Sequence, residues 1–407
     1  EGADLSACEG LEALPATLSN ALPATALAAA PENQVIYVGG KEVTSGGYWT
    51  TDSAGNVTAY TSGDTPTDNY IHYDVANNTL TLHNATIKES VSTDTSTFIA
   101  GAAIGVHNQN GAAELTITLE GTNTIAEVGK GIYVLADSTG GATLTITGDG
   151  SLDASARQTG IWVQSNSGNA TLTIRNAKVE ATGTSTAGYG VNVQSSNSST
   201  AALTVDGGSL TASGSPGILY DSIGSGTVPN TTALTISNSA IVDARGGGIG
   251  AGLLHDLKKV SPADNSVGIV FDGNEGTVYG NVTLQENLTI GEGESLTIPD
   301  NSSLNTNGNT VTVENGGTLT GEVNGQQSPQ ITTPPQSQIV TEGENAKFSV
   351  TASGNPLTYQ WQQKTTESDS SWTDISGAAT ASYTTEATTT SMNGCQYRCV
   401  VTASGVS

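Results

Sequence analysis

The chain has 407 residues, and its 38 Asp and Glu against 12 Lys and Arg give a net charge of −26 at pH 7. Such a charge repels nucleic acid and anionic membranes, so we expect neither as a partner. No run of 18 apolar residues occurs, so we expect no transmembrane helix and no membrane insertion. A composition rich in Thr, Ser, Asn and Gly and poor in Lys suits an extracellular protein.

Three cysteines, Cys8, Cys395 and Cys399, are too few for a disulfide framework. Cys395 and Cys399 fall four residues apart in a predicted strand, which separates their Cα atoms by roughly 13 Å and prevents a bridge. The N-terminus lacks a basic segment followed by an apolar core, so we expect no intact signal peptide and interpret the chain as a mature secreted fragment.

The first 79 residues differ from the rest. In residues 1–32, leucines fall at helical spacing, but Pro15 and Pro23 limit any helix to a short piece, so we expect either an ordered tail or a short helical cap over the first coil. Residues 33–79 are predicted to form short strands that concentrate the aromatic side chains Tyr48, Trp49, Tyr60, Tyr70 and Tyr73. We interpret residues 33–79 as a β cap over an exposed sheet edge, with an aromatic sugar-binding face as the alternative.

A repeat organises the middle of the chain. Leu115-Thr116-Ile117 recurs at steps of 28 to 31 residues, as Leu144-Thr145-Ile146, Leu172-Thr173-Ile174, Leu203-Thr204-Val205 and Leu234-Thr235-Ile236, and an earlier copy is Leu80-Thr81-Leu82. Each repeat holds three short runs in which apolar residues alternate with polar ones, the period of a β-strand. One copy cannot bury these apolar faces alone, so stacked copies must share a continuous core. The threonines would then form a β-branched ladder that stabilises the sheet.

The third run of each repeat starts with glycine. Gly131, Gly160, Gly190 and Gly217 precede the aligned segments Ile132-Tyr133-Val134, Ile161-Trp162-Val163, Val191-Asn192-Val193 and Ile218-Leu219-Tyr220, and they predict a bend that a side chain would obstruct. The sequence therefore predicts an all-β protein whose residues 33–325 form a right-handed parallel β-helix with three strands per coil. A β-propeller is the rival fold, but four-stranded blades of about 40 residues fit these repeats less well.

The remaining chain is predicted to form narrower coils at residues 267–325, then a linker, then a second domain at residues 331–407. The second domain resembles an immunoglobulin-like module, because Trp361 matches the core tryptophan of strand C and Tyr397, two residues before Cys399, matches the tyrosine corner. The resemblance places Val350 where the partner cysteine would be, which leaves Cys399 a buried free thiol. We expect the module to be truncated, since Ser407 comes before a full strand G.

Residues 33–325 are also similar to modular surface proteins of Gram-positive gut bacteria, in which a VGG…GGYWT segment (here residues 38–50) and an NTLTLHNATI strand (residues 78–87) precede a β-helix. Those proteins are considered adhesin-like and carry immunoglobulin-like repeats after the β-helix. The resemblance implies an extracellular location on the bacterial cell surface or wall, and neighbouring immunoglobulin-like repeats in the full-length chain.

The sequence offers two candidate sites. Tyr133, Trp162 and Asn192 share one outward position of the third strand, so with Gln164 they are predicted to form an exposed face that binds sugar rings. Burial of these aromatics beneath a loop, or packing of Trp162 on its neighbour, is the alternative. Asp153 and Glu180 occupy outward positions on successive coils, a spacing of about 5 Å that would permit a carboxylate pair of a retaining glycosidase or a Ca²⁺ site.

These features favour a binding protein over an enzyme. No base with the geometry of a lyase accompanies Asp153 and Glu180, and the histidines, His72, His83, His107 and His255, show no metal-binding spacing. We therefore expect an adhesin-like protein that binds glycan or a host or matrix surface protein through the β-helix, without a cofactor. A polysaccharide lyase or glycosidase and a passive stalk are the alternatives.

Overall fold

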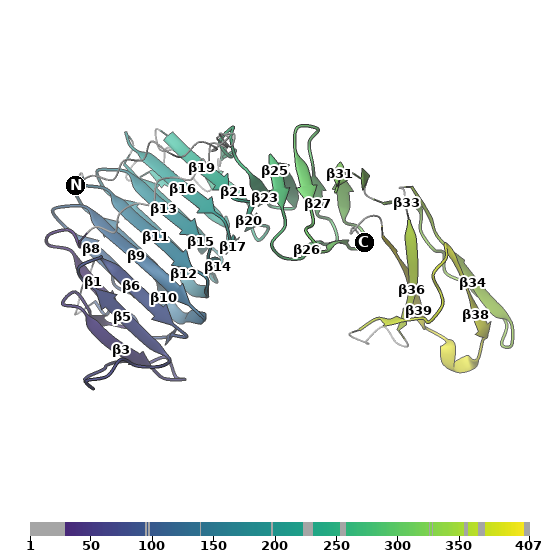
Figure 1. The fold of residues 1–407 in the computed structure, drawn as a ribbon, viewed down its shortest axis with the longest axis horizontal. Helices are drawn as coiled ribbons and strands as arrows, with labels where there is room; N and C mark the ends of the chain where they lie inside the picture. Colours follow the sequence, from purple (N-terminus) through teal and green to yellow (C-terminus); the bar gives the residue numbers. More distant parts are fainter. Residues whose placement is uncertain are drawn as a thin grey trace, which may run out of the picture.

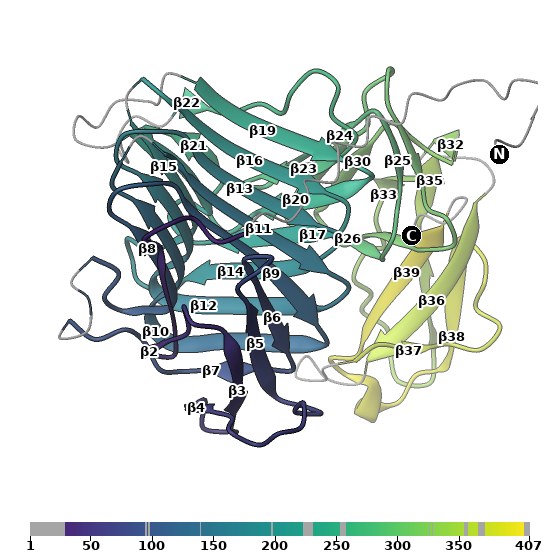
Figure 2. The same ribbon diagram turned by 60° about the vertical axis from the view of Figure 1, so that its left-hand side comes forward.

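The computed structural model describes residues 29–402, except residues 94–95, 97, 139, 197, 223–230, 253–257, 325, 328, 354–356 and 365–370. The expected cap or tail of residues 1–32 lies almost wholly outside the described residues, as do Cys8 and His255. The described chain is all-β and contains a parallel β-solenoid of about five turns (Figure 1). Sheets that run along its axis form its walls (Figure 2).

The first wall, here called the first ladder, consists of six parallel strands in the repeat region: β6 (Thr79–His83), β9 (Ala113–Glu120), β11 (Ala142–Gly148), β13 (Ala170–Arg175), β16 (Thr200–Asp206) and β19 (Thr231–Ser237). The repeated Leu-Thr-Ile segments pair in register from Leu115 to Leu234, as the repeat predicts. The alignment of the earliest copy is wrong by two residues, because Leu80 pairs with Ile117. Since a strand has period two, this shift keeps Leu80 on the inward side.

The second and third walls share the two longest strands, each of which contributes its first part to one wall and its last part to the other. The second ladder comprises β7 (Thr86–Ile87), the first parts of β10 (Thr122–Ala136) and β12 (Ser151–Ser165), β14 (Lys178–Gly183), β17 (Ser209–Ser213), β20 (Ala240–Ala244) and β23 (Gly268–Asp272). The third ladder comprises β8 (Ala102–Asn108), the last parts of β10 and β12, β15 (Tyr189–Ser195), β18 (Ile218–Ser222) and β21 (Ile249–Ala251). β10 passes between the two ladders through register shifts around Val128.

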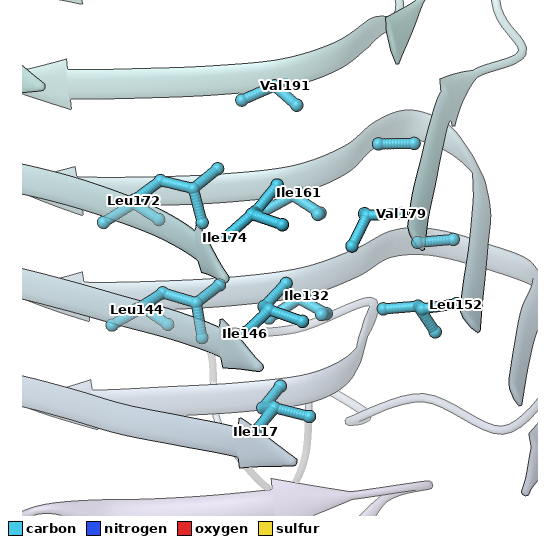
Figure 3. Close-up of a cluster of buried hydrophobic side chains, with 14 of the residues drawn as sticks. Ile117, Ile132, Leu144, Ile146, Leu152, Ile161, Leu172, Ile174, Val179 and Val191 are labelled. Carbon is cyan, nitrogen blue, oxygen red and sulfur yellow. The ribbon is translucent and has the colours of Figure 1, made fainter. Parts of the chain in front are cut away.

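The solenoid core consists of stacked aliphatic side chains. Ile132, Ile161 and Val191 lie one above another in the third ladder, and Leu144 and Leu172 do the same in the first (Figure 3). All five are fully buried. Because strands alternate their side chains between two faces, the residues between these positions point away from the core.

The corner between the second and third ladders leaves no room for side chains. A Cβ atom at Gly160 would lie 2.7 Å from the carbonyl oxygen of Ala154 and 2.8 Å from that of Gly190. Equivalent approaches surround Gly131, Gly190 and Gly217. The glycine that begins each third strand is therefore required by close packing, as the sequence predicts.

Antiparallel strands cover the first coil. β1 (Val35–Val38) pairs with β8 and with β2 (Lys41–Glu42), whereas β3 (Gly47–Thr51), β4 (Val57–Ala59) and β5 (Tyr70–Asp74) extend the first ladder. Trp49 and Tyr73 point into the core and are buried. Tyr48 and Tyr70 are partly exposed on the opposite face of the same strands.

Shorter strands continue the solenoid around a second hydrophobic cluster that includes Phe271 and Leu296. They are β24 (Glu275–Tyr279), β25 (Asn281–Thr283), β26 (Leu288–Ile290), β27 (Ser295–Thr297), β28 (Ser303–Asn305), β29 (Val311–Val313), β30 (Thr318–Thr320), β31 (Glu322–Val323) and β32 (Gln326–Gln327). The preceding strand, β22 (Lys258–Lys259), pairs antiparallel with β21 of the third ladder.

Arg245 joins these short-strand coils to the wide ones. Its guanidinium lies 3.9 Å from the ring centre of Phe271, its Nη1 is 2.6 Å from Glu294 Oε2, and its Nε is 3.2 Å from Asp243 Oδ2. Nη1 also donates a hydrogen bond to the carbonyl oxygen of Thr289. A single side chain thus connects residues of the last wide coil with the first short-strand coils.

The C-terminal unit packs around Trp361, which is fully buried and donates a hydrogen bond from Nε1 to the carbonyl oxygen of Thr380. Val350 is also buried there, and Cys399 is a half-buried free thiol whose pKa burial raises to about 11. The elements are β33 (Gln330–Thr333), β34 (Asn345–Ser349), β35 (Thr351–Ser353), β36 (Thr358–Lys364), β37 (Thr373–Asp374), β38 (Ser382–Ala387), the 3₁₀ helix η1 (Thr390–Met392) and β39 (Gln396–Thr402).

The crowded corner predicts the effect of a single methyl group. Gly160→Ala should lower the free energy of unfolding by about 1–3 kcal/mol, because its Cβ would overlap backbone atoms that cannot move independently. Urea denaturation measures the change. Gly63→Ala is the matched control, since no atom lies within 4 Å of the Cβ it would add. Equal stability of the two variants would contradict the close packing.

Candidate functional site

The outward side of the third ladder gathers the most chemically varied side chains of the solenoid. We call this surface the third-ladder face and define it by two adjacent rows of outward positions: Tyr133, Trp162, Asn192 and Leu219 in one, and Leu135, Gln164, Gln194 and Asp221 in the other. Each row follows the solenoid axis, because successive members pair on neighbouring strands. Neighbouring members are therefore about 4.8 Å apart at their backbones.

Two aromatic rings form the apolar part of this face. Tyr133 and Trp162 stack with their ring centres 4.8 Å apart, as their register predicts. Lys130 Nζ lies 5.1 Å from the centre of the Tyr133 ring and 5.8 Å from that of Trp162, within the range of cation–π attraction. Trp162 is partly exposed, so its outer surface can contact a ligand.

The predicted exposure is wrong for Tyr133 and Asn192, and for Tyr133 the structure agrees with the alternative of burial beneath a loop. Tyr133 is only 5 % exposed, because it packs with Val91, Ile99 and Leu135 in a small cluster outside the solenoid core. Val91 and Ile99 belong to the segment between β7 and β8. Asn192 is also buried, so Trp162 is the one predicted row member that combines an aromatic ring with exposure.

A chain of hydrogen bonds holds the rings and amides in place. Tyr133 donates its hydroxyl hydrogen to Gln164 Oε1 at 2.6 Å, and Gln164 Nε2 donates to Asn166 Oδ1 at 2.8 Å. Asn166 Nδ2 donates to Asp137 Oδ1 at 2.6 Å, and Asp137 Oδ2 lies 2.8 Å from His107 Nε2. Burial raises the pKa of Tyr133, so its hydroxyl remains a donor at neutral pH. Gln164 therefore has a fixed orientation beside Trp162.

Two polar atoms of the face have no protein partner. Trp162 Nε1 and Asn192 Oδ1 are both buried, and neither has a hydrogen-bond partner among the described residues. The two residues pair directly on neighbouring strands, but these two atoms do not bond to each other. A buried polar atom without a partner costs about 1–3 kcal/mol, so these two residues make the fold less stable than an apolar pair would.

Asp221 ends the second row and was missed by sequence reasoning, although it follows Gln164 and Gln194 at the same register. Gln194 Nε2 donates to Asp221 Oδ2 at 3.1 Å. Burial raises the pKa of Asp221, and hydrogen bonds from the Ser222 backbone and from Gln194 partly oppose that rise. The sequence could have indicated Asp221, because it lies two residues after Leu219, as Gln164 lies two residues after Trp162.

Asp153 and Glu180 lie elsewhere, on the outward side of the second ladder. They pair directly on β12 and β14, as predicted, and Asp153 Oδ1 accepts a hydrogen bond from Ser155. Lys178, on the same face as Glu180, forms an ion pair with Glu286. Two carboxylates supply fewer oxygen ligands than Ca²⁺ requires. Within the described ranges, no group of three or more His, Cys, Asp and Glu side chains could hold a metal ion.

The aromatics of the β cap form cross-strand stacks on the outer face of β3, β5 and β6. Tyr48 stacks on His72 with ring centres 4.1 Å apart, and Tyr70 stacks on His83 at 4.8 Å. Glu120 Oε2 lies 3.0 Å from His83 Nδ1 and accepts a hydrogen bond from the Tyr70 hydroxyl. The rings thus turn their faces toward each other, which suits stabilisation of the cap better than stacking on a sugar.

Comparison with known proteins finds no relative of the chain. No family model matches it, and no curated protein or solved structure is significantly similar to it. No helix in the described part of the chain is long and apolar enough to cross a membrane.

The stacked His72 predicts a pH dependence. Burial lowers its pKa below the ordinary value of 6.5, against a smaller opposite effect of Asp74, so the fold favours neutral imidazole. The contribution of neutral His72 to the stability of the fold is therefore complete above pH 6.5, and it is lost as the pH falls through the lowered pKa of the folded state. Thermal unfolding from pH 8 to pH 5 should show a smaller loss of stability for His72→Phe, which keeps a stacked ring, than for the unchanged chain. If both proteins lost the same stability between pH 8 and pH 5, the pH dependence could not be assigned to His72.

Asn192 predicts a conflict between stability and binding. Asn192→Leu removes an unpaired buried oxygen and places an apolar side chain between Trp162 and Leu219, so stability should rise by about 1 kcal/mol. Gln194→Leu is the matched control and should lose stability, because its amide is bonded to Asp221. Urea denaturation compares the two variants. A destabilised Asn192→Leu variant would indicate that the amide serves the fold.

Proposed function

We propose that this chain is an adhesin-like binding protein of the bacterial cell surface that recognises glycan through the third-ladder face. One observation carries the proposal: the partly exposed indole of Trp162 stacks on Tyr133 beside Gln164, whose amide is held in place by hydrogen bonds to Tyr133 and Asn166. An aromatic face with adjacent polar groups matches a sugar ring, which offers apolar C–H groups and hydroxyls together.

The remaining architecture supports binding more than catalysis. The rings and Gln164 are held by packing and by a continuous hydrogen-bond chain, so a ligand meets a preformed surface. Hydrolysis of a glycosidic bond would require a second carboxylate across the ligand from Asp221. The nearest carboxylate in the network, Asp137, already contacts His107 and Asn166.

The finer fold assignments belong to the same proposal. We take the solenoid to be right-handed, the usual hand of parallel β crossovers. We take the C-terminal unit to be an immunoglobulin-like module that acts as a spacer. Pairing of Trp361 with Cys399 between β36 and β39, with Val350 buried beside them, supports that assignment. An acidic, extracellular chain built from a solenoid and a spacer suits presentation of a binding face away from the cell wall.

The test is a glycan array and a polysaccharide pull-down with the full 407-residue chain, with product release assayed on the same samples. Trp162→Ala should weaken binding about tenfold or more, because it removes the ring and the indole donor. The affinity of Trp162→Phe should lie between those of the unchanged chain and Trp162→Ala, since phenylalanine keeps a ring but lacks the indole donor. Thr173→Ala, on the outward side of the first ladder, is the control and should bind normally.

Each result decides between classes of function. Binding that follows the order of these variants supports a sugar-binding face. Release of sugar fragments would overturn the non-catalytic assignment in favour of a lyase or glycosidase. Absence of binding to every glycan tested would overturn the proposal and leave a protein-binding adhesin or a structural stalk.

A further inference from the structure

We infer that the third-ladder face takes a linear, uncharged oligosaccharide that lies along the solenoid axis over several coils. This inference rests on the glycan-binding function proposed above and specifies its ligand. It differs from recognition of one terminal sugar, for which the Trp162 ring and the adjacent Gln164 would suffice.

The direction follows from the register of the strands. Gln164, Gln194 and Asp221 occupy one outward position on three consecutive coils, so their polar groups form a line parallel to the axis. Successive members are separated by about 4.8 Å. That separation is close to the length of one pyranose residue in an extended chain, so each coil can meet one sugar unit.

The hydrogen bonds within this line leave atoms available to a ligand. Gln194 uses Nε2 to bond Asp221 Oδ2, and its Oε1 has no hydrogen bond within the described residues. Gln194 and Asp221 are both partly exposed. The line therefore offers acceptor oxygens of Gln194 and Asp221 on successive coils. A row of hydroxyls provides matching partners.

An exposed aromatic ring extends the line at its other end. Phe98 is 51 % exposed and stacks on His107 with ring centres 4.6 Å apart. His107 pairs with Leu135, which pairs with Gln164, so Phe98 lies near the start of the same row. From His107 to Asp221 there are four coil steps, or about 19 Å. This length corresponds to about four sugar residues.

The charge of the face favours an uncharged ligand. Asp221 and Asp137 place carboxylates on the face of a chain whose net charge is −26. The cation nearby, Lys130, donates a hydrogen bond to the carbonyl oxygen of Ala100 and is directed over the aromatic rings. An acidic polysaccharide such as a polyuronate would therefore meet more repulsion than attraction.

The experiment measures affinity against ligand length by calorimetry on the full chain. The probes are xylose, mannose and glucose with their linear oligosaccharides of two to six residues, beside oligogalacturonides of the same lengths. For the sugar series that binds, affinity should rise at least tenfold from the monosaccharide to the tetrasaccharide and then level off. Oligogalacturonides should bind more weakly than the neutral series.

Variants locate the subsites. Gln194→Ala and Phe98→Ala should reduce tetrasaccharide affinity about three- to tenfold and leave monosaccharide affinity unchanged, because each side chain meets a sugar unit other than the one on Trp162. Trp162→Ala should weaken every length. Thr173→Ala is again the control, and circular dichroism establishes that each variant is folded.

The outcomes separate this inference from the proposed function. Equal affinity for monosaccharide and tetrasaccharide, or equal effects of Gln194→Ala on all lengths, would overturn the axial arrangement and preserve glycan binding. Tighter binding of oligogalacturonides would overturn the uncharged ligand. No binding in any series would overturn the proposed function and this inference together.

Discussion

Hydrogen bonding between successive coils at constant register is the constraint on which the rest of this structure depends. Because each first-ladder strand pairs with the same positions of the next from β9 to β19, a residue type chosen at one position is stacked on its counterparts. The aliphatic core, the glycine corner and the outward rows all follow from this rule. A change in one coil is therefore felt by the coils on either side of it.

The sequence predicted well what depends on this periodicity. The Leu-Thr-Ile register, the inward aliphatic positions and the crowded corner at Gly160 could all be read from spacing and from the absence of a Cβ atom. The register of Leu80 was misjudged because the segment between β7 and β8 changes the length of the first repeat, and a period-two pattern gives no signal of a two-residue shift.

The candidate site was only partly predictable. The stack of Tyr133 on Trp162 follows from register, but the burial of Tyr133 depends on Val91 and Ile99, which lie outside any repeat. The hydrogen-bond chain from Tyr133 to His107 also could not be read from the sequence, since it depends on side-chain orientations across coils. Where the periodic rule would place an apolar neighbour for Leu219, the chain has Asn192 with an unpaired oxygen. Such local departures from the most stable choice are expected at functional sites.

The two hydrophobic clusters of the solenoid have a consequence for cooperativity. The two clusters meet at β20 and β23, which pair in parallel and contribute side chains to both, and Arg245 adds polar contacts at the same place. In a linear array, the interface between neighbouring units determines whether they unfold together, and here that interface is a continuous parallel sheet. Loss of the short-strand coils would therefore uncover Ile269 and Phe271 of β23 and weaken the last wide coil, so damage that starts from the C-terminal side is transmitted along the solenoid.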